Sequence, residues 1–262
     1  MDDLKRRLVE GEALLGTMVN MLDHPDLARI FANCGLDFFM IDCEHGYFDP
    51  SAAGRLFALA REVGIPPFVR IPEVRRDLVL MYLEMGASGI LLPQTETVEQ
   101  AEALVAYAKY APLGDRGVSL MRPHTRYQKV EAAEYMRMAN ERTVLAIQIE
   151  SVAAVENVDK LIAVEGIDLA FVGPGDLSQS MGIPGQTRAP VFVETVERII
   201  TAVKAQHKFA GIHCMKAEDA RFWIDKGTAF NLWANEIVML MNAARAGMAE
   251  IRAARGTEGA AS

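Results

Sequence analysis

Two acidic residues stand where apolar segments of strand length end. Glu150 closes TVLAIQIE (residues 143–150), and Asp176 follows DLAFVG (168–173) after a short turn. Two carboxylates with no His or Cys partner favour a hard cation, because Mg²⁺ or Mn²⁺ commonly takes one or two protein carboxylates and completes its shell with water and substrate. The sequence therefore predicts a divalent-cation site on Glu150 and Asp176. Each acid alone could equally be a helix N-cap or a first-turn acid stabilised by the helix dipole.

Further polar residues follow other apolar segments, namely Asp42, Glu44 and His45 in IDCEHGYFD, Arg70 in FVRIP and Gln148 in AIQIES. Arg70 offers a rigid guanidinium fork suited to a carboxylate or an enolate oxygen. His45 is the only well-placed group that titrates near neutral pH, and Asp42 or Glu44 stands near enough to orient it. Taken singly, Arg70 could pair with a surface acid and His45 could be an ordinary loop histidine. Their joint occurrence favours a site for an anionic, oxygen-rich substrate.

The turn Gly173-Pro174-Gly175 separates the sixth apolar segment from Asp176. Glycine allows a backbone to approach a bound molecule closely, and the N–H of Gly175 can donate to a ligand oxygen. We therefore expect Gly173, Pro174 and Gly175 to contact the substrate.

The elements that would position these residues alternate along the chain. Eight short apolar runs are separated by amphipathic helical patterns, and the runs cover residues 14–20, 37–42, 66–71, 88–93, 143–150, 168–173, 208–214 and 228–233. Runs rich in Val, Ile, Leu and Phe suit parallel strands that are covered on both faces. A closed (β/α)₈ barrel gathers the carboxyl ends of all strands at one mouth. The alternative is a doubly wound open sheet, but no glycine-rich nucleotide motif follows any run.

Composition narrows the class of protein and its ligands. A chain of 262 residues with 51 % hydrophobic residues suits one barrel domain over residues 1–256, followed by a disordered tail, 257–262. The net charge of −8 argues against nucleic acid and anionic membranes as partners. No apolar segment approaches the ~18 residues of a membrane span. Three widely spaced cysteines, Cys34, Cys43 and Cys214, specify no disulfide framework, so we expect a cytoplasmic protein.

The segments quoted above resemble the HpcH/HpaI aldolase family, the metal-dependent class II pyruvate aldolases. GLDFFMIDCEHGYFD is similar to the family's D-x-E-H segment, PPFVRIPE to its Arg strand, LEMGASGILLPQTETVEQA to its G-A-x-G-I-x-x-P segment, and IQIES with FVGPGDLSQSMG to its metal motifs. The resemblance implies a TIM barrel of the phosphoenolpyruvate/pyruvate-binding type. It also implies a C-terminal helix swapped between subunits of a homo-oligomer, usually a hexamer built as a trimer of dimers.

Residue roles follow from the same resemblance. It implies Mg²⁺, Mn²⁺ or Co²⁺ on Glu150 and Asp176, with no organic cofactor. It implies that pyruvate chelates the cation while Arg70 and the backbone around Gly175 stabilise the enolate. His45 with Asp42 would form an acid–base dyad that acts through a metal-bound water.

The remaining expected contacts are Gln148 and Glu44 at the pyruvate site, Trp233 at the acceptor pocket, Arg116 and Arg122 facing the aldehyde end, and Glu84 reaching a neighbouring subunit. The chain departs from the family pattern at two of these places. Glu84 stands where members usually carry Asp, and the loop after Arg116 holds the bulkier Met121, Pro123 and His124. Since that loop shapes the acceptor end, acceptor preference is the least transferable property.

The expected reaction is reversible aldol cleavage of a 4-hydroxy-2-oxo acid to pyruvate and an aldehyde through a metal-stabilised enolate. The same fold and metal site could instead condense an oxo-acid enolate with a non-aldehyde acceptor, as in citrate-synthase-like siderophore biosynthesis. A Schiff-base mechanism would need a lysine such as Lys216, but HCMKAED supplies nothing that lowers its pKa. A catalytically silent barrel that only binds acids is a fourth possibility, although no motif carries a lesion that favours it.

Overall fold

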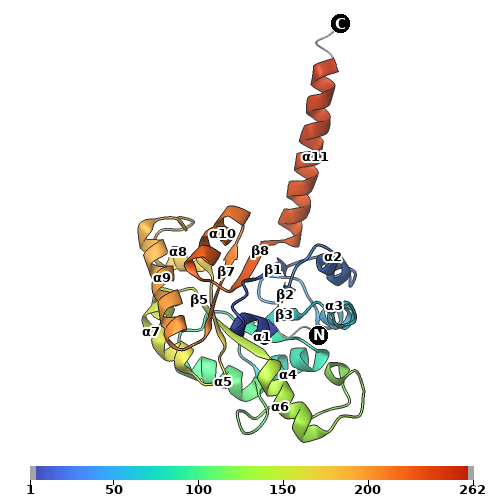
Figure 1. Cartoon of the computed structure of the whole chain (residues 1–262), viewed down its shortest axis with the longest axis vertical. Helices are drawn as coiled ribbons and strands as arrows, with labels where there is room; N and C mark the ends of the chain where they lie inside the picture. Colours follow the sequence, from blue (N-terminus) through green and yellow to red (C-terminus); the bar gives the residue numbers. More distant parts are fainter. Residues whose placement is uncertain (1–3, 259–262) are drawn as a thin grey trace.

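The chain forms a closed barrel of eight parallel strands in sequential order, surrounded by helices (Figure 1). The structure is a computed structural model that describes residues 4–258. The strands are β1 (Leu14–Val19), β2 (Phe38–Asp42), β3 (Pro67–Arg70), β4 (Gly89–Leu92), β5 (Val144–Ile149), β6 (Leu169–Val172), β7 (Phe209–Cys214) and β8 (Phe230–Asn235). Each lies within or overlaps one of the eight predicted runs, so the predicted (β/α)₈ barrel is confirmed.

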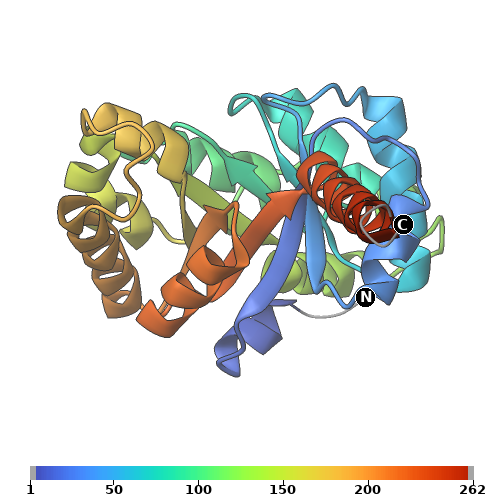
Figure 2. The ribbon, with the colours of Figure 1, turned by 90° about the horizontal axis from the view of Figure 1, so that it is seen from above.

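Helices connect the strands and cover the outside of the barrel (Figure 2). They are α1 (Leu4–Val9), α2 (Leu27–Asn33), α3 (Pro50–Val63), α4 (Arg76–Met85), α5 (Val98–Ala108), α6 (Ala132–Arg142), α7 (Val152–Ala163), α8 (Pro174–Ser180), α9 (Pro190–Ala205), α10 (Ala217–Lys226) and α11 (Glu236–Glu258), with a short 3₁₀ helix η1 (Pro123–Thr125). The long connection between α5 and β5 contains η1 and α6. No described helix has the length and apolarity that crossing a membrane requires.

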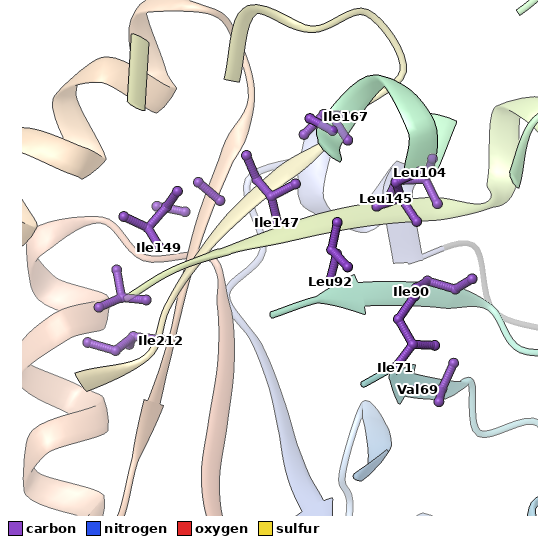
Figure 3. Packing of buried hydrophobic residues seen from close by; sticks show 14 of the residues in the cluster. Val69, Ile71, Ile90, Leu92, Leu104, Leu145, Ile147, Ile149, Ile167 and Ile212 are labelled. Carbon is purple, nitrogen blue, oxygen red and sulfur yellow. The ribbon is translucent and has the colours of Figure 1, made fainter. Parts of the chain in front are cut away.

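Side-chain alternation divides the core into two layers. In β5, Leu145 and Ile147 pack against the helices (Figure 3), whereas Val144 and Ala146 belong to the cluster inside the barrel. Successive side chains of a strand point to opposite faces, so every second residue continues toward the interior. The residues that continue this inward series past Ala146 are Gln148 and Glu150, at the carboxyl end.

Four buried phenylalanine rings pack in the barrel interior below that end, namely Phe38, Phe68, Phe171 and Phe230. Phe38 stacks on Phe230 with ring centroids 4.0 Å apart, and Phe68 lies 5.4 Å from Phe38. Glycine makes room for them: a Cβ at Gly16 would lie 2.6 Å from the Phe38 ring, and one at Gly89 would lie 2.3 Å from the Phe68 ring. The interior is therefore a packed core, and polar chemistry is confined to its ends.

The last helix, α11, extends away from the barrel (Figure 1). Its first residue, Glu236, is buried and accepts hydrogen bonds from the backbone N–H groups of Asn20 (2.9 Å) and Met21 (2.7 Å), which fixes the helix to the loop after β1. Farther along, the exposed apolar side chains are Leu240, Met241, Met248 and Ile251. The helix runs to Glu258, and residues 259–262 of the predicted tail lie outside the described part of the chain.

Candidate active site

The inward-facing series of three strands converge at the carboxyl end of the barrel. Phe38 and Met40 inside the barrel lead to Asp42, and Phe68 leads to Arg70. Asp42 and Arg70 are register partners across the β2–β3 pair. Together with Gln148 and Glu150 of the β5 series, they form one polar cluster above the aromatic core.

Asp42 holds Arg70 in a bidentate ion pair. Arg70 Nε donates to Asp42 Oδ1 (2.9 Å), and Nη2 donates to Oδ2 (2.6 Å). Asp42 is fully buried, and Oδ1 also accepts the backbone N–H groups of Glu44 (3.1 Å) and His45 (3.2 Å). Burial alone would raise the pKa of Asp42, but the hydrogen bonds and charge of Arg70 outweigh it and leave the pKa below its ordinary value. Asp42 is thus a fixed anion that orients the guanidinium.

The carboxylate of Glu150 is buried among other acids. Its Oε1 accepts the backbone N–H of Gln94 (2.6 Å), and its Oε2 accepts Nε2 of Gln148 (2.5 Å). Burial, supported by the charges of Glu44 and Asp176, raises the pKa of Glu150 to about 7. A bound cation would reverse this shift, because it favours the charged carboxylate.

Backbone geometry at two further residues shapes the Glu150 site. Gln94 has a left-handed backbone, with φ of 47°, which is uncommon for a residue other than glycine. A Cβ on Gly173 would lie 2.5 Å from Glu150 Oε2 and 2.6 Å from Gln148 Nε2, so a larger residue there would displace both of these polar groups. By contrast, nothing lies within 4 Å of a Cβ on Gly175, so its neighbourhood is open for a ligand.

Asp176 and Glu44 complete the acidic surroundings. Asp176 is exposed in the first turn of α8, where its carboxylate is accessible to a ligand. Glu44 Oε2 lies 3.2 Å from Arg70 Nη1 but is buried without a hydrogen bond. Burial raises the pKa of Glu44, against the opposing charge of Arg70.

The donor set fits a hard divalent cation. Within residues 4–258 no three His, Cys, Asp or Glu side chains are arranged as a complete metal site. Magnesium-type ions need only one or two protein carboxylates and keep several water ligands, so Glu150 and Asp176 suffice in number and chemistry. The buried Gln148 Oε1 has no hydrogen-bond partner within the described chain, which leaves an acceptor for water or a substrate hydroxyl.

His45 lies beside the cluster but not on Asp42. Its side chain is 63 % exposed, and Nε2 lies 3.8 Å from Glu44 Oε2. The expected pairing of the His45 ring with Asp42 is therefore replaced by the Asp42–Arg70 pair. The reason is the parallel register, which turns Asp42 and Arg70 toward each other, while the His45 ring belongs to the turn after β2.

Two other expected contacts lie away from the cluster in the single chain. Arg122 Nε lies 3.5 Å from Glu84 Oε2, and Glu84 belongs to the last turn of α4. Barrel helices run opposite to the strands, so this pair lies near the amino ends, and Arg122 does not join the cluster of its own chain. Trp233 is 39 % exposed, and alternation places it on the opposite face of β8 from Phe230 and Leu232, outside the barrel interior.

Arg116 also lies elsewhere than the sequence analysis expected. Only 6 % of the residue is exposed, and its guanidinium lies over Tyr110, 4.6 Å from the ring centroid. Its cavity is lined by Gly86–Ser88 before β4 and by Thr143 before β5, which places Arg116 at the amino end of the barrel. It therefore does not face the aldehyde end of its own chain. The loop sequence carries no signal of this turn toward the opposite end.

The lysines do not support a Schiff base. Lys216 is exposed and lies 3.5 Å from Glu218, which is not the desolvated pocket that such a lysine needs. Burial lowers the pKa of Lys109 to about 8, but its Nζ donates to the carbonyls of Asn140 (2.7 Å) and Thr143 (2.6 Å) near the amino end.

Comparison with known proteins agrees with the geometry. The family model described as HpcH/HpaI aldolase/citrate lyase matches residues 18–243. The chain belongs to this family. It is 35 % identical to a hydroxypyruvate/pyruvate aldolase of Pseudomonas aeruginosa, over 92 % of this chain and 89 % of that protein.

Two solved structures of the family extend the comparison. The HpcH/HpaI aldolase from Desulfitobacterium hafniense superposes with a TM-score of 0.92 and 35 % identity, covering 95 % of this chain and 96 % of that one. The citrate synthase SbnG superposes with a TM-score of 0.86 and 29 % identity, covering 97 % and 99 %. The chain is thus similar both to proteins named as aldolases and to one named as a citrate synthase.

Proposed function

We propose that this chain catalyses reversible aldol cleavage of a 4-hydroxy-2-oxo acid to pyruvate and an aldehyde. The observation that carries the proposal is the convergence of Arg70, Gln148 and Glu150 at the carboxyl end of the barrel. Breaking the C3–C4 bond leaves an electron pair on C3, which moves into the 2-oxo group as an enolate. When bound at Glu150 and Asp176, the divalent cation supplies a Lewis acid for that oxygen.

Arg70 provides fixed positive charge for the oxo acid. Because Asp42 engages Nε and Nη2, the remaining nitrogen, Nη1, is the one directed to Glu44 and to an arriving anion. A preorganised donor of this kind stabilises charge that develops during reaction, since it needs no reorientation. Gln148 Oε1 and the N–H of Gly175 can bind the polar groups of the substrate, and Gly173 and Pro174 form the turn that positions that N–H.

His45 is the group that moves the proton. Its exposed ring lies beside the acidic cluster, with Nε2 3.8 Å from Glu44 Oε2. In cleavage it accepts the proton of the C4 hydroxyl as the C3–C4 bond breaks, and C3 of the enolate then takes up a proton to give pyruvate; in synthesis His45 returns the proton to the new C4 oxygen. Replacement of His45 by Ala then lowers turnover more than substrate binding.

The likeness to SbnG supports a second candidate function. At 29 % identity over nearly the whole chain, a citrate synthase shares this architecture. The same enolate would then attack the carbonyl carbon of a non-aldehyde acceptor. The fixed Arg70 and the acidic pair serve both reactions, so the acceptor distinguishes them.

The test follows hydrogen exchange and products together. Protein loaded with Mg²⁺ or Mn²⁺ is incubated with pyruvate in D₂O, the methyl signal is followed by NMR, and aldehydes including succinic semialdehyde and hydroxylated three-carbon compounds are screened. Exchange with an aldol product supports cleavage, whereas exchange without any aldehyde product favours condensation. Absence of both would refute the proposal. Glu141→Gln, which changes an exposed acid of α6, serves as the matched control for Glu150→Gln.

We further propose a cytoplasmic homo-oligomer, a hexamer assembled as a trimer of dimers, in which α11 is swapped between subunits. The protruding helix and its exposed Leu240, Met241 and Ile251 support this arrangement. Within it, Glu84 and Arg122 of one subunit would reach the site of a neighbour, and Trp233 would adjoin the exchanged helix. Residues 1–256 form one domain in this proposal, and the cation is Mg²⁺, Mn²⁺ or Co²⁺.

A further inference from the structure

A cavity of about 320 Å³ lies at the amino end of the barrel, beneath the starts of β4 and β5. Its polar lining is dominated by basic and aromatic side chains from α3, α6 and the long loop, namely Arg61, Arg116, His124, Arg126, Tyr135 and Arg142. None of its lining residues within the described chain is Asp or Glu. The protein as a whole carries a net charge of −8, so a cavity lined by four arginines is locally positive in an acidic protein.

Arg116 is the buried member of this group. Only 6 % of the residue is exposed, and its Nε and Nη2 have no hydrogen-bond partner within residues 4–258. Leaving a buried ion without hydrogen bonds costs several kcal/mol. Burial accordingly lowers the pKa of Arg116. The guanidinium lies over Tyr110, and this contact leaves Nε and Nη2 without a hydrogen-bond partner.

Arg61 repeats the pattern from the opposite wall. Its Nη1 donates to the carbonyl of Pro123, but its buried Nε has no partner within the described chain. Burial, followed by the like charge of Arg126, lowers the pKa of Arg61. Arg126 Nη2 donates to the Arg61 carbonyl (2.9 Å), which holds the Arg126 guanidinium close to Arg61. Two like charges therefore lie together, and the nearest acid, Glu62, lies 3.9 Å from Arg126 Nη1 and does not line the cavity.

His124 does not relieve this excess of positive charge. Its Nδ1 lies 2.5 Å from Tyr135 Oη, and its Nε2 lies 3.0 Å from the carbonyl of Ser119, so both ring nitrogens are engaged. Burial and the charge of Arg116 lower the pKa of His124 to about 4, which keeps the ring neutral at pH 7. The buried side-chain donors of the cavity that have no hydrogen-bond partner within the described chain are Nε and Nη2 of Arg116 and Nε of Arg61.

We propose that this cavity binds a phosphate group, as inorganic phosphate or as the end of a small phosphate ester. A phosphate presents several oxygens to more than one guanidinium fork, whereas a single carboxylate satisfies one. The site is separate from the proposed active site. Thr143 lines the cavity just before β5, and Glu150 directly follows β5, seven residues later. At ~3.3 Å per residue the two positions are roughly 23 Å apart. The proposal does not depend on the proposed aldolase activity.

Calorimetric titration of the Mg²⁺-loaded protein tests the site. The titrants are inorganic phosphate and glycerol 3-phosphate at constant ionic strength, with oxalate present to saturate the carboxyl-end site. We expect one phosphate site per chain that persists in oxalate. Arg116→Gln should weaken binding at least tenfold, and Arg116→Lys should restore part of it. The matched control Arg55→Gln changes an exposed arginine of α3, the helix that carries Arg61, and should leave binding unchanged.

The two titrants separate the possible sources of the group. Tighter binding of glycerol 3-phosphate identifies an ester site, and tighter binding of inorganic phosphate identifies a site for the free ion. No binding to the wild type at millimolar phosphate, full displacement by oxalate, or equal weakening by Arg55→Gln would overturn the proposal. If Arg116→Gln does not fold, a wild-type crystal soaked in tungstate decides: anomalous density between Arg61 and Arg116 is expected, and its absence there overturns the site.

Discussion

Replacing Asp42 by Asn should disable Arg70 while leaving the fold intact. The substitution keeps an oxygen that can accept the backbone N–H groups of Glu44 and His45, but it places an amide N–H₂ against one of the two guanidinium donors. The pair is buried, so neither group can turn to water for compensation. Arg70 would then lose its bidentate partner and its fixed orientation.

The magnitude follows from burial and from the remaining acid. Breaking a buried ion pair from one side destabilises a protein by about 3–5 kcal/mol. Glu44 stays within 3.2 Å of Arg70 Nη1 and compensates in part, so we expect a loss near the lower end, about 3 kcal/mol. A displaced catalytic group commonly costs about 10² in rate, and we expect a loss of that order in pyruvate methyl exchange.

The assay combines urea unfolding with kinetics in a double-mutant cycle. Asp42→Asn is combined with Arg70→Lys and, separately, with His45→Ala. Residues that act together show non-additive effects, so the first pair should be strongly coupled and the second nearly additive. Asp26→Asn, which alters an exposed acid paired with Arg29, should change stability by no more than about 0.5 kcal/mol. Coupling of Asp42 to His45 rather than to Arg70 would refute the assignment of Asp42 as the orienting anion.

Three further outcomes are expected. Glu150→Gln or Asp176→Asn should weaken Mn²⁺ binding in calorimetry and abolish methyl exchange, and retained exchange in both would contradict the ligand assignment. The folded-state pKa of His124 is lowered to about 4 from 6.5, so the unfolded state binds more protons between these values and stability falls as pH drops through this window. Between pH 7 and pH 4.5, the free energy of unfolding should fall by about 2 kcal/mol less in His124→Gln than in the wild type, as measured by urea unfolding. An unchanged pH dependence would contradict the lowered pKa of His124. Replacing Leu240 and Met241 by Asp should reduce the mass of the assembly in light scattering if α11 mediates it, whereas an unchanged mass would exclude that role.

The alternating pattern of the strands explains why much of the cluster could be predicted from sequence. Asp42, Arg70, Gln148 and Glu150 all continue inward-facing apolar series, and parallel strands bring their carboxyl ends together. The location of the cluster thus follows from parallel strand ends that meet at one mouth, and alternation within each strand turns these four side chains inward. The family resemblance implied a dyad of His45 with Asp42, whereas in this chain β-sheet register places Asp42 against Arg70, and Glu44, the other acid expected near His45, lies 3.8 Å from its ring.

Other features depend on backbone geometry that composition does not encode. Gln94 has a left-handed backbone, and its backbone N–H donates to Glu150. Nothing in the sequence predicted this, because glutamine rarely adopts a positive φ. Arg116 and Arg122 lie in a long connection whose course is determined by packing near α3 and α4 rather than by periodicity. Arg116 and Arg122 therefore lie near the amino end of their own chain, while Asp42, Arg70, Gln148 and Glu150 lie at its carboxyl end.

Crystals grown with Mn²⁺ and oxalate provide the most direct test of a cation that stabilises the enolate. We expect an anomalous peak about 2.0–2.2 Å from carboxylate oxygens of both Glu150 and Asp176, with oxalate bridging the ion and the Arg70 guanidinium. A fully occupied peak held by other residues, or no peak at saturating Mn²⁺, would contradict the proposed chemistry.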